Sequence, residues 1–409
     1  MNSATASENL PRVLFLTSEA PHTGAAGAIV FHRLLRDYPP DRLLVMTNQP
    51  PPPLAGRLAC RYVHLPLAAD RLNRTRLWPW KAILRSLGAS SLPSLGAIDR
   101  QLQGFTPDVV VTLMQDSWYY DLAARYARHH GLPLVLFVHD LPSGFEPVPG
   151  WLASRQRARD AAVYRQAAAR LCISRGMADW FLAEYGVPGE VLLPPRGDDT
   201  PAQAPETCRV LKIQEQLTLG YAGGLHYGYG EQLLALLPML RETGTKLEYF
   251  GPQPTGVVAA LGAATDVIRF NGYAPTPAEA WRTLLARCDV ILQPYLNPPG
   301  MHELQYRTHF PSKLGDCLSL GLPLLITGPE YASGVSWCAQ HSGCALRVTE
   351  PSVAALCDAL FRLREQPALR QQLASGAQAA ALVFDATTLR ARFHACLETV
   401  HATHVRRSG

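Results

Sequence analysis

The chain has 409 residues, of which 47% are hydrophobic and 17% charged, as in ordinary globular proteins, and this length predicts two domains. The net charge of +5 is small and spread out, which excludes the strongly basic surface of a nucleic-acid-binding protein. No apolar run approaches the roughly 18 residues that span a membrane, and no basic region precedes the first apolar stretch as in a signal peptide.

Short apolar runs alternate with helical patterns through the first half of the chain. We predict strands at residues 12–17, 43–47, 109–114, 134–139, 171–173 and 191–193, with helices such as 29–36 and 119–128 between them. Continuous apolar strands separated by helices indicate a parallel sheet that is covered on both faces.

Residues 194–206 are rich in Pro, Ala and acidic residues and lack periodicity, which is typical of a linker. A second alternation follows, with strands expected at 217–221, 246–250, 267–270, 290–292 and 322–327 and helices at 230–240, 277–286, 313–320, 353–364, 367–380 and 387–402. The sequence therefore predicts an α/β protein with two doubly wound, Rossmann-like domains facing across a cleft, where ligands bind at the carboxyl ends of the strands. The expected boundaries are 1–195 for the first domain, 196–210 for the linker, 211–384 for the second domain and 385–409 for a helix that packs back toward the first.

The nine cysteines form no C-x-x-C motif and lie in apolar runs, which predicts buried free thiols and a reducing, cytoplasmic location. No Asp-x-Asp motif and no His/Cys cluster indicates a metal site.

Residues 309–328 (HFPSKLGDCLSLGLPLLITG) contain a polar turn, an amphipathic helix and a buried strand, separated by Gly321 and Pro323. Ser312 and Lys313 thus lie at a helix N-terminus, where amide N–H groups and the helix dipole favour an anion. Lys313 is one of four lysines among 38 Lys and Arg residues, which indicates a need for a compact point charge. The alternative is a capped surface helix with a solvated lysine.

A glycine-rich loop, YAGGLHYGYG at 221–230, ends the first strand of the second domain. Gly223 and Gly224 allow backbone amides to approach a ligand, although glycines also serve simply to make tight turns. His226 in this loop is either a ligand contact or an ordinary loop residue. The loop at 293–309 is long for a strand–helix connection, and long loops are often functional.

In the first domain, the loop at 17–28 contains Gly24 and Gly27 but no G-x-G-x-x-G dinucleotide fingerprint. His139 and Asp140 end a strong strand. An imidazole suits proton transfer near neutral pH, and the carboxylate beside it can fix the imidazole tautomer. A buried structural histidine is the alternative.

The segment that begins at Arg71 and ends at Arg85, RLNRTRLWPWKAILR, holds five basic residues, two Trp and no acid. This composition suits an anionic membrane surface or a lipid-linked acceptor. A flexible lid and an ordinary surface helix are the alternatives.

The segment at 309–328 resembles the donor-binding helix of GT-B glycosyltransferases, especially glycosyltransferase family 4, in its Phe-Pro-Ser-Lys-Leu opening, its acidic residue and its small-Leu-Gly-x-Pro ending. Asp316 falls at the second Glu of the family's Glu–seven residues–Glu motif, whereas the first Glu falls at Thr308. The family often has Arg at position 224 and Lys at position 229, where this chain has Gly224 and Tyr229.

The resemblance implies roles for the residues that match the family pattern. Those implied at the donor diphosphate are Gly24, Gly27, Gly223, Gly224, His226, Ser312, Lys313 and Asp316. Tyr273 is implied to stack on the base, with an interface aromatic as the alternative, and Glu303, Arg307 and Phe310 lie where the family recognises the donor sugar. His139 and Asp140 are implied to lie at the reacting centre near the acceptor.

The resemblance predicts a retaining, metal-independent enzyme that moves a sugar from a UDP- or GDP-sugar to an acceptor hydroxyl, in polysaccharide or glycolipid assembly. It implies no cofactor and a saccharide or lipid-linked acceptor. The small net charge predicts no nucleic-acid partner, the cysteines predict a cytoplasmic protein, and the segment at 71–85 suits a contact with the inner face of the membrane. The alternatives are a sugar-nucleotide epimerase or hydrolase on the same fold, and a non-catalytic binding protein.

Overall fold

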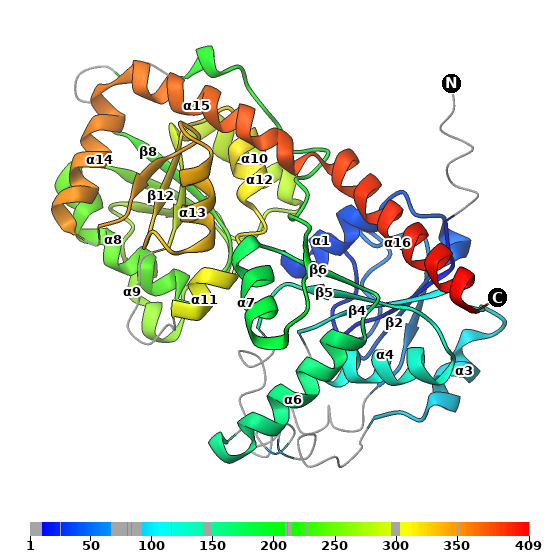
Figure 1. Ribbon diagram of the computed structural model, residues 1–409. Coiled ribbons are helices and arrows are strands. Elements are labelled where there is room, and N and C mark those ends of the chain that lie inside the picture. The colour runs from blue at the N-terminus through cyan, green and yellow to red at the C-terminus, as the bar shows by residue number, and fades with distance from the viewer. Residues whose placement is uncertain are drawn as a thin grey trace. The chain divides into compact units, whose positions relative to one another are not determined.

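The computed structural model describes residues 10–24, 26–66, 80, 83, 92–115, 117–141, 149–208, 211, 215–225, 228–295, 303–350 and 352–408. The chain forms two compact units, the first made of Met1–Leu193 with Thr387–Gly409 and the second of Pro194–Ala386. Each unit is built on one parallel sheet with helices around it (Figure 1). The two sheets confirm the α/β, doubly wound class that the alternating pattern predicts.

The sheet of the first unit has the strand order β3-β2-β1-β4-β5-β6-β7, and all its pairs are parallel. Its strands are β1 (Val13–Leu16), β2 (Leu43–Thr47), β3 (Arg61–His64), β4 (Val109–Leu113), β5 (Leu134–Val138), β6 (Ala169–Cys172) and β7 (Glu190–Val191). Every residue of β1, β2, β4 and β5 is buried, because these central strands are covered on both faces. The chain changes direction across the sheet between β1 and β4, which is where ligands of such folds bind.

The described helices of the first unit are α1 (Ala26–Leu35), the short η1 (Pro40–Arg42), α3 (Leu95–Leu102), α4 (Ser117–His129), α6 (Gly150–Gln166), α7 (Arg175–Tyr185) and, from the end of the chain, α16 (Ala386–Ser408). α16 buries Leu389, Phe393 and Leu397 in the core of this unit, at a spacing of four residues that forms one helix face. Arg390 on the same helix forms an ion pair with Asp37 at 3.1 Å.

The sheet of the second unit has the order β10-β9-β8-β11-β12-β13. Its strands are β8 (Thr218–Ala222), β9 (Lys246–Phe250), β10 (Ile268–Phe270), β11 (Val290–Pro294), β12 (Leu324–Thr327) and β13 (Leu346–Val348). The direction changes between β8 and β11. These two strands pair at Leu219–Val290 and at Gly220–Ile291, whereas β11 stays paired with β12 as far as Pro294. The pairing of β8 with β11 therefore ends before the carboxyl ends of the two strands, which is where ligands of such folds bind.

Helices cover both faces of this sheet. They are α8 (Tyr229–Thr243), α9 (Ala260–Ala263), α10 (Pro277–Arg287), α11 (Glu303–Thr308), α12 (Leu314–Ser319), α13 (Ser333–Gln340), α14 (Val353–Glu365) and α15 (Pro367–Ala381), with short 3₁₀ turns at η3 (Pro205–Thr207), η4 (Gly256–Val258) and η5 (Leu382–Phe384). The residues at the start of α10 explain why the helix begins there. The Thr276 hydroxyl caps the amide of Glu279, and Pro277 occupies the first helical position.

Two strands differ from the sequence prediction because they lie at sheet edges. β3 and β13 each pair on one side only and carry exposed residues, so neither contains the continuous apolar run that marks a central strand. The predicted loop at 293–309 is also interrupted, since its last third forms α11.

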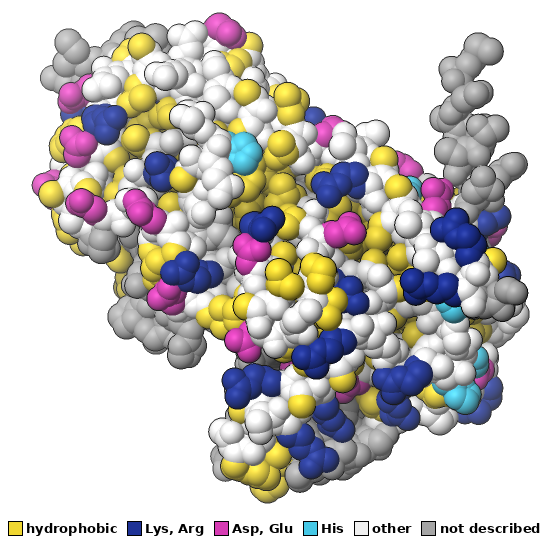
Figure 2. Space-filling view, viewed as in Figure 1, with side chains coloured by type: hydrophobic (Ala, Val, Ile, Leu, Met, Phe, Trp, Pro, Cys, Tyr) yellow, Lys and Arg dark blue, Asp and Glu magenta, His cyan; other side chains and the backbone are white. Residues whose placement is uncertain are grey.

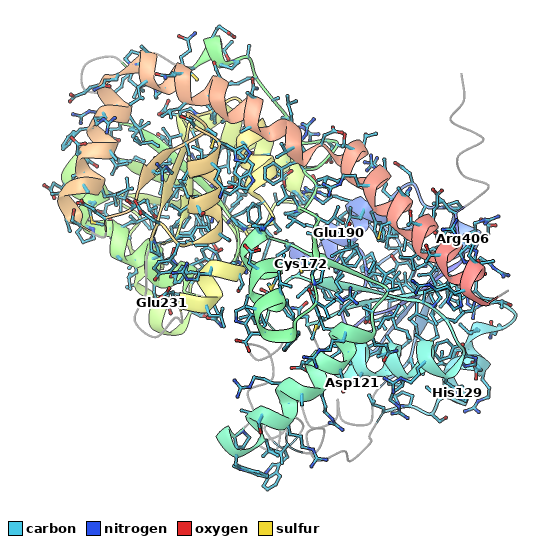
Figure 3. All side chains as sticks on the ribbon, in the orientation of Figure 1. Asp121, His129, Cys172, Glu190, Glu231 and Arg406 are labelled. Carbon is cyan, nitrogen blue, oxygen red and sulfur yellow. The ribbon has the colours of Figure 1, made fainter. Side chains whose placement is uncertain are left out.

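All nine cysteines are free, and six of them are buried. Cys172 on β6, labelled in Figure 3, is one of these, and burial raises the pKa of its thiol to about 11. Among the described residues, no helix is long and apolar enough to cross a membrane.

Candidate functional site

The loop that follows β8 is held by the hydroxyls of two buried tyrosines. The Gly223 amide donates to the carbonyl of Phe250 on β9 at 2.9 Å. The Tyr249 hydroxyl donates to the Gly223 carbonyl at 3.1 Å, and the Tyr221 hydroxyl donates to the Gly224 carbonyl at 2.9 Å. Two successive peptide units of the predicted ligand loop are thus fixed from the core side.

Lys313 lies against this loop, 90 residues later in the chain. Its Nζ donates to the carbonyl of Ala222 at 2.7 Å and lies 3.9 Å from the ring centre of Tyr221 and 5.4 Å from that of Tyr229. A Cβ on Gly223 would overlap Nζ, so glycine there permits the approach. Burial lowers the pKa of Lys313 to about 8. Among the described residues no carboxylate pairs with Lys313, so its charge is balanced only by a carbonyl and two aromatic faces.

Sequence reasoning missed the tyrosines around Lys313. Consecutive rings lie 5.7 to 6.4 Å apart, centre to centre, along the series Tyr249, Tyr221, Tyr229, Tyr295 and Tyr306. At position 229, where the resembled family often has Lys, the tyrosine hydroxyl lies 3.4 Å from Nε2 of His309. The available signal was the clustering of tyrosines around the glycines of the loop at 221–230.

Asp316 lies one helical turn beyond Lys313 and is buried. Its Oδ1 accepts hydrogen bonds from the amide of Gly197 at 2.7 Å and from the hydroxyl of Thr200 at 2.6 Å. The hydroxyl of Thr308, at the family's other acidic position, is bonded within α11. Ser312 is half-buried at the turn before α12. The structure therefore joins Asp316 to the segment at 197–200, and Lys313 to the glycine loop.

The three residues predicted at the donor sugar lie in different surroundings. Glu303 and Arg307 are exposed on α11 and form an ion pair with each other, and Arg307 also lies 4.9 Å from the ring centre of Tyr331. Phe310 is buried, with its ring stacked at 6.1 Å on that of Phe384. Glu303 and Arg307 are thus available to a ligand, whereas Phe310 packs in the core.

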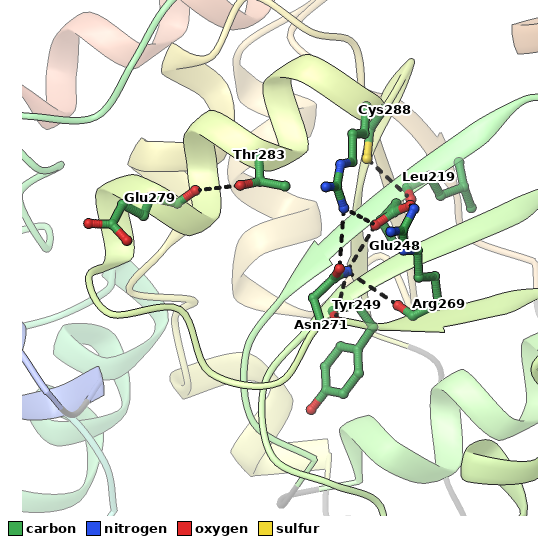
Figure 4. Close-up of polar contacts among 9 residues, drawn as sticks. Leu219, Glu248, Tyr249, Arg269, Asn271, Glu279, Thr283 and Cys288 are labelled. Carbon is green, nitrogen blue, oxygen red and sulfur yellow. Dashed lines mark hydrogen bonds and ion pairs between the residues drawn. The ribbon is translucent and has the colours of Figure 1, made fainter.

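Tyr273, the predicted base contact, is 79% exposed. A polar network fixes the strand end just before it (Figure 4). Asn271 Nδ2 donates to the buried carboxylate of Glu248 at 2.9 Å, and Glu248 also pairs with Arg269 at 3.7 Å and with Arg287 at 3.6 Å. An exposed aromatic ring on a fixed loop suits stacking with a planar ligand.

In the first unit, Gly27 lies against the carboxylate of Glu19. Glu19 Oε1 accepts the amide of Ala28 in the first turn of α1 at 3.1 Å, and a Cβ on Gly27 would overlap the Glu19 carboxyl group. Burial raises the pKa of Glu19, the hydrogen bond from Ala28 lowers it, and the charge of Asp140 raises it further. Glu19 and Asp140 are therefore close enough to interact at the carboxyl edge of this sheet.

His139 lies at the same edge, directly after β5. Its imidazole is buried and stacks face to face on Phe31 of α1, with ring centres 4.9 Å apart and planes at 5°. This contact joins the end of β5 to the helix after β1. The rings of Phe31 and Phe137 thus restrict the orientation of the imidazole.

Gly24 is exposed, and its amide donates to Nδ1 of His22 at 2.8 Å. His226 and nearly all of the basic and aromatic segment at 71–85 lie outside the described residues. Within the described part of the chain, no group of three His, Cys, Asp or Glu side chains could hold a metal ion.

Comparisons with known proteins agree with this architecture. Residues 60–197 match the family model described as a glycosyl transferase 4-like domain. No curated protein matches the sequence. The solved structure of Anabaena HepE in complex with UDP and glucose is 15% identical, with a TM-score of 0.65 over 95% of this chain and 99% of its own.

Two further structures have the same fold. WaaG, a glycosyltransferase involved in lipopolysaccharide biosynthesis, is 17% identical, with a TM-score of 0.59 over 94% of this chain and 99% of its own. A glycosyltransferase from Rickettsia africae is 11% identical, with a TM-score of 0.61 over 95% and 98% of the two chains. The chain therefore has the GT-B fold and resembles GT-B glycosyltransferases.

Proposed function

We propose that this protein is a glycosyltransferase that moves a sugar from a UDP- or GDP-sugar to an acceptor hydroxyl. The observation that carries the proposal is Lys313, a half-buried ammonium with no carboxylate partner among the described residues, held beside the glycine loop at the carboxyl end of β8. A cation in this position suits the diphosphate that leaves the sugar. HepE, which shares the fold, was solved with UDP and glucose.

In the proposed reaction, the bond between the anomeric carbon and the diphosphate oxygen breaks, and a bond from that carbon to the acceptor oxygen forms. The acceptor loses its proton, and the diphosphate leaves with the bonding electrons. We assign His139 and Asp140 to the acceptor side, where a fixed imidazole suits the handling of that proton. Positive groups and backbone amides stabilise the leaving diphosphate, so the proposed mechanism is metal-independent, and we propose retention of the anomeric configuration.

The test compares wild type with Lys313→Ala and with Lys246→Ala as a matched control. Lys246 is in the same unit and donates to a backbone carbonyl, that of Asp266, but lies at the surface. Each variant is screened by thermal shift and by turnover against UDP-, GDP- and ADP-sugars. One nucleotide class should stabilise wild type and Lys246→Ala, with slow hydrolysis of the donor, and Lys313→Ala should lose both effects.

A wild type that no nucleotide stabilises at millimolar concentration would overturn the proposal. Nucleotide binding without any turnover, even with acceptors supplied, would favour the non-catalytic alternative. Release of a free altered sugar without an acceptor would favour the epimerase or hydrolase.

We propose a saccharide or lipid-linked acceptor, since WaaG acts in lipopolysaccharide biosynthesis. A contact with an anionic membrane is consistent with the basic side chains over α6 in Figure 2. On this helix Arg155 and Arg157 are exposed, and Trp151 is 69% exposed at its start. Sedimentation with phosphatidylglycerol vesicles, compared with phosphatidylcholine vesicles, tests the contact. Binding to the anionic vesicles should fall in Arg155→Glu/Arg157→Glu.

A further inference from the structure

The glycine loop presents two consecutive backbone amides on the side away from its tyrosines. In a trans peptide unit the C=O and N–H bonds point in opposite directions. The carbonyl of Gly223 points to the Tyr249 hydroxyl and that of Gly224 points to the Tyr221 hydroxyl. The amides of Gly224 and Leu225, which belong to these same two peptide units, therefore point away from the core.

These two amides are not used by the rest of the described chain. Within the described residues, no hydrogen bond is recorded from the amide of Gly224 or of Leu225, and both residues are half-buried rather than enclosed. Successive backbone N–H groups that converge on one side form a concave anion site. The loop therefore offers donors at the carboxyl edge of the sheet.

The same tyrosine that fixes one of these amides also holds the nearby cation. Lys313 Nζ lies over the face of the Tyr221 ring, 3.9 Å from the ring centre, and the Tyr221 hydroxyl donates a hydrogen bond to the Gly224 carbonyl. Tyr221 and Tyr249 are themselves stacked, with ring centres 5.7 Å apart and planes at 13°. The two rings thus form one rigid support beneath both the amides and the ammonium.

The geometry points to Tyr221 and Tyr249 as positioning residues for the donor diphosphate, which they orient by aiming the Gly224 and Leu225 amides and the Lys313 ammonium at one anion. This inference rests on the proposed function. It also accounts for how a chain with Gly224 and Tyr229, in place of two cations, would bind a diphosphate. Backbone donors held by tyrosines replace side-chain charge.

Phenylalanine variants separate this role from simple packing. Tyr221→Phe and Tyr249→Phe keep both stacked rings and the cation–π contact, and remove only the hydroxyl that holds each carbonyl. Tyr38→Phe is the matched control, because the buried Tyr38 hydroxyl also donates to a backbone carbonyl, that of Pro11 in the first unit, at 2.6 Å. Each variant loses a hydroxyl that donates to a backbone carbonyl, and the Tyr249 hydroxyl also lies 3.1 Å from a second carbonyl, that of Pro252.

The probes are UDP, GDP and inorganic pyrophosphate, with dissociation constants measured by calorimetry beside the melting temperature of each protein. Tyr221→Phe and Tyr249→Phe should raise the dissociation constants of pyrophosphate and of the nucleotide that wild type binds by the same factor. This factor should be roughly three- to tenfold, as expected for one hydrogen bond. Tyr38→Phe should change only the melting temperature. An equal loss for pyrophosphate is the discriminating result, because it locates the defect at the phosphates.

A second measurement covers variants that fold poorly. In wild type with ¹⁵N-labelled glycine, pyrophosphate should shift the Gly224 amide proton resonance downfield, and the shift should be smaller in Tyr221→Phe. If wild type binds none of the three probes, the proposed function fails. If wild type binds them, and both tyrosine variants bind them equally well with an unchanged Gly224 shift, the positioning role is overturned while the proposed function stands.

Discussion

The carboxylate of Asp316 accepts a 2.6 Å hydrogen bond from the hydroxyl of Thr200, which lies 116 residues earlier in the chain. The same oxygen accepts the amide of Gly197. Lys313, one turn before Asp316, contacts the loop after β8 instead. The short helix α12 is therefore joined to the segment at 197–200 by its acid, while its lysine is directed at the glycine loop.

We predict that Asp316→Ala lowers stability more than it lowers nucleotide affinity. Removing the carboxylate leaves the Gly197 amide and the Thr200 hydroxyl without their acceptor, which costs about 1–3 kcal/mol, or roughly 2–4 °C of melting temperature for each kcal/mol. Asp266→Ala is the control, because it removes a carboxylate from an exposed ion pair with Arg241 and should cost far less. If Asp316→Ala melts like wild type but no longer responds to nucleotide, Asp316 acts on the ligand and not on the fold.

Nucleotide affinity should depend on pH through Lys313. Because burial lowers its pKa to about 8, the side chain is charged below pH 8 and neutral above it. A diphosphate binds the charged form, so its dissociation constant should change by less than about 1.5-fold from pH 6.5 to 7.5 and should rise up to about tenfold per pH unit above pH 8. Titration calorimetry between pH 6.5 and 9.5 measures this.

Lys313→Arg supplies the control for that titration, since an arginine stays charged throughout the range. The variant should bind more weakly at pH 7, because the planar guanidinium is larger than the ammonium that lies over Tyr221, but with an affinity that no longer falls above pH 8. A slope that persists in Lys313→Arg would assign the titration to another group.

His139→Ala should lower kcat by roughly 10²–10⁴-fold and leave nucleotide affinity unchanged, as expected for loss of a proton-transfer group. His64→Ala, an exposed histidine of the same unit whose Nε2 lies 2.9 Å from the Asn48 carbonyl, should keep full turnover. Steady-state kinetics combined with nucleotide calorimetry make the comparison. Full turnover in His139→Ala would overturn the proposed proton-transfer role of the imidazole.

Glu19→Gln should stabilise the first unit at pH 8 and have little effect in acid. Folding raises the pKa of Glu19, so the folded state disfavours its charge, and the penalty is present above that raised pKa and disappears as the pH falls through it. The glutamine oxygen can still accept the Ala28 amide. Melting temperatures at pH 8 and pH 4 test the sign, and a variant that is less stable than wild type at pH 8 would contradict it.

Gln293→Met should raise stability by about 1 kcal/mol. Gln293 is fully buried near the end of β11, and both polar atoms of its amide lack a hydrogen-bond partner among the described residues. An unpaired buried amide is costly, and Met has nearly the same length and volume. The urea midpoint of unfolding is the measurement. A loss of stability would mean that the amide has a partner that the methionine cannot replace.

The sequence was sufficient for the central strands and most helices, because a buried parallel strand such as β4 is a continuous apolar run and its neighbouring helices are amphipathic. It failed for the edge strands β3 and β13, whose mixed burial does not distinguish them from loops. The pattern of apolar residues in a sequence follows burial, and an edge strand is only partly buried, so its pattern is weak.

At the candidate site, the family resemblance was enough to predict that Lys313 and Gly223 lie close together, and the structure brings them together. The partners of Asp316 could not be predicted, because a hydrogen bond to Gly197 spans 119 residues and leaves no periodic trace. The role of Tyr221 was missed for a related reason. The sequence pattern predicts that a tyrosine in a buried strand packs in the core, and it does not show whether the tyrosine hydroxyl also bonds to a loop carbonyl.

The setting of Lys313 also has a consequence for its chemical reactivity. With a pKa of about 8, roughly one Lys313 side chain in ten is a free amine at pH 7, and a free amine is a nucleophile toward acylating reagents. The chain contains only four lysines, so the sites of acylation are easily assigned by peptide mass spectrometry. The extent of acylation of Lys313 should therefore fall when a ligand occupies the site, so occupancy can be measured without introducing a label.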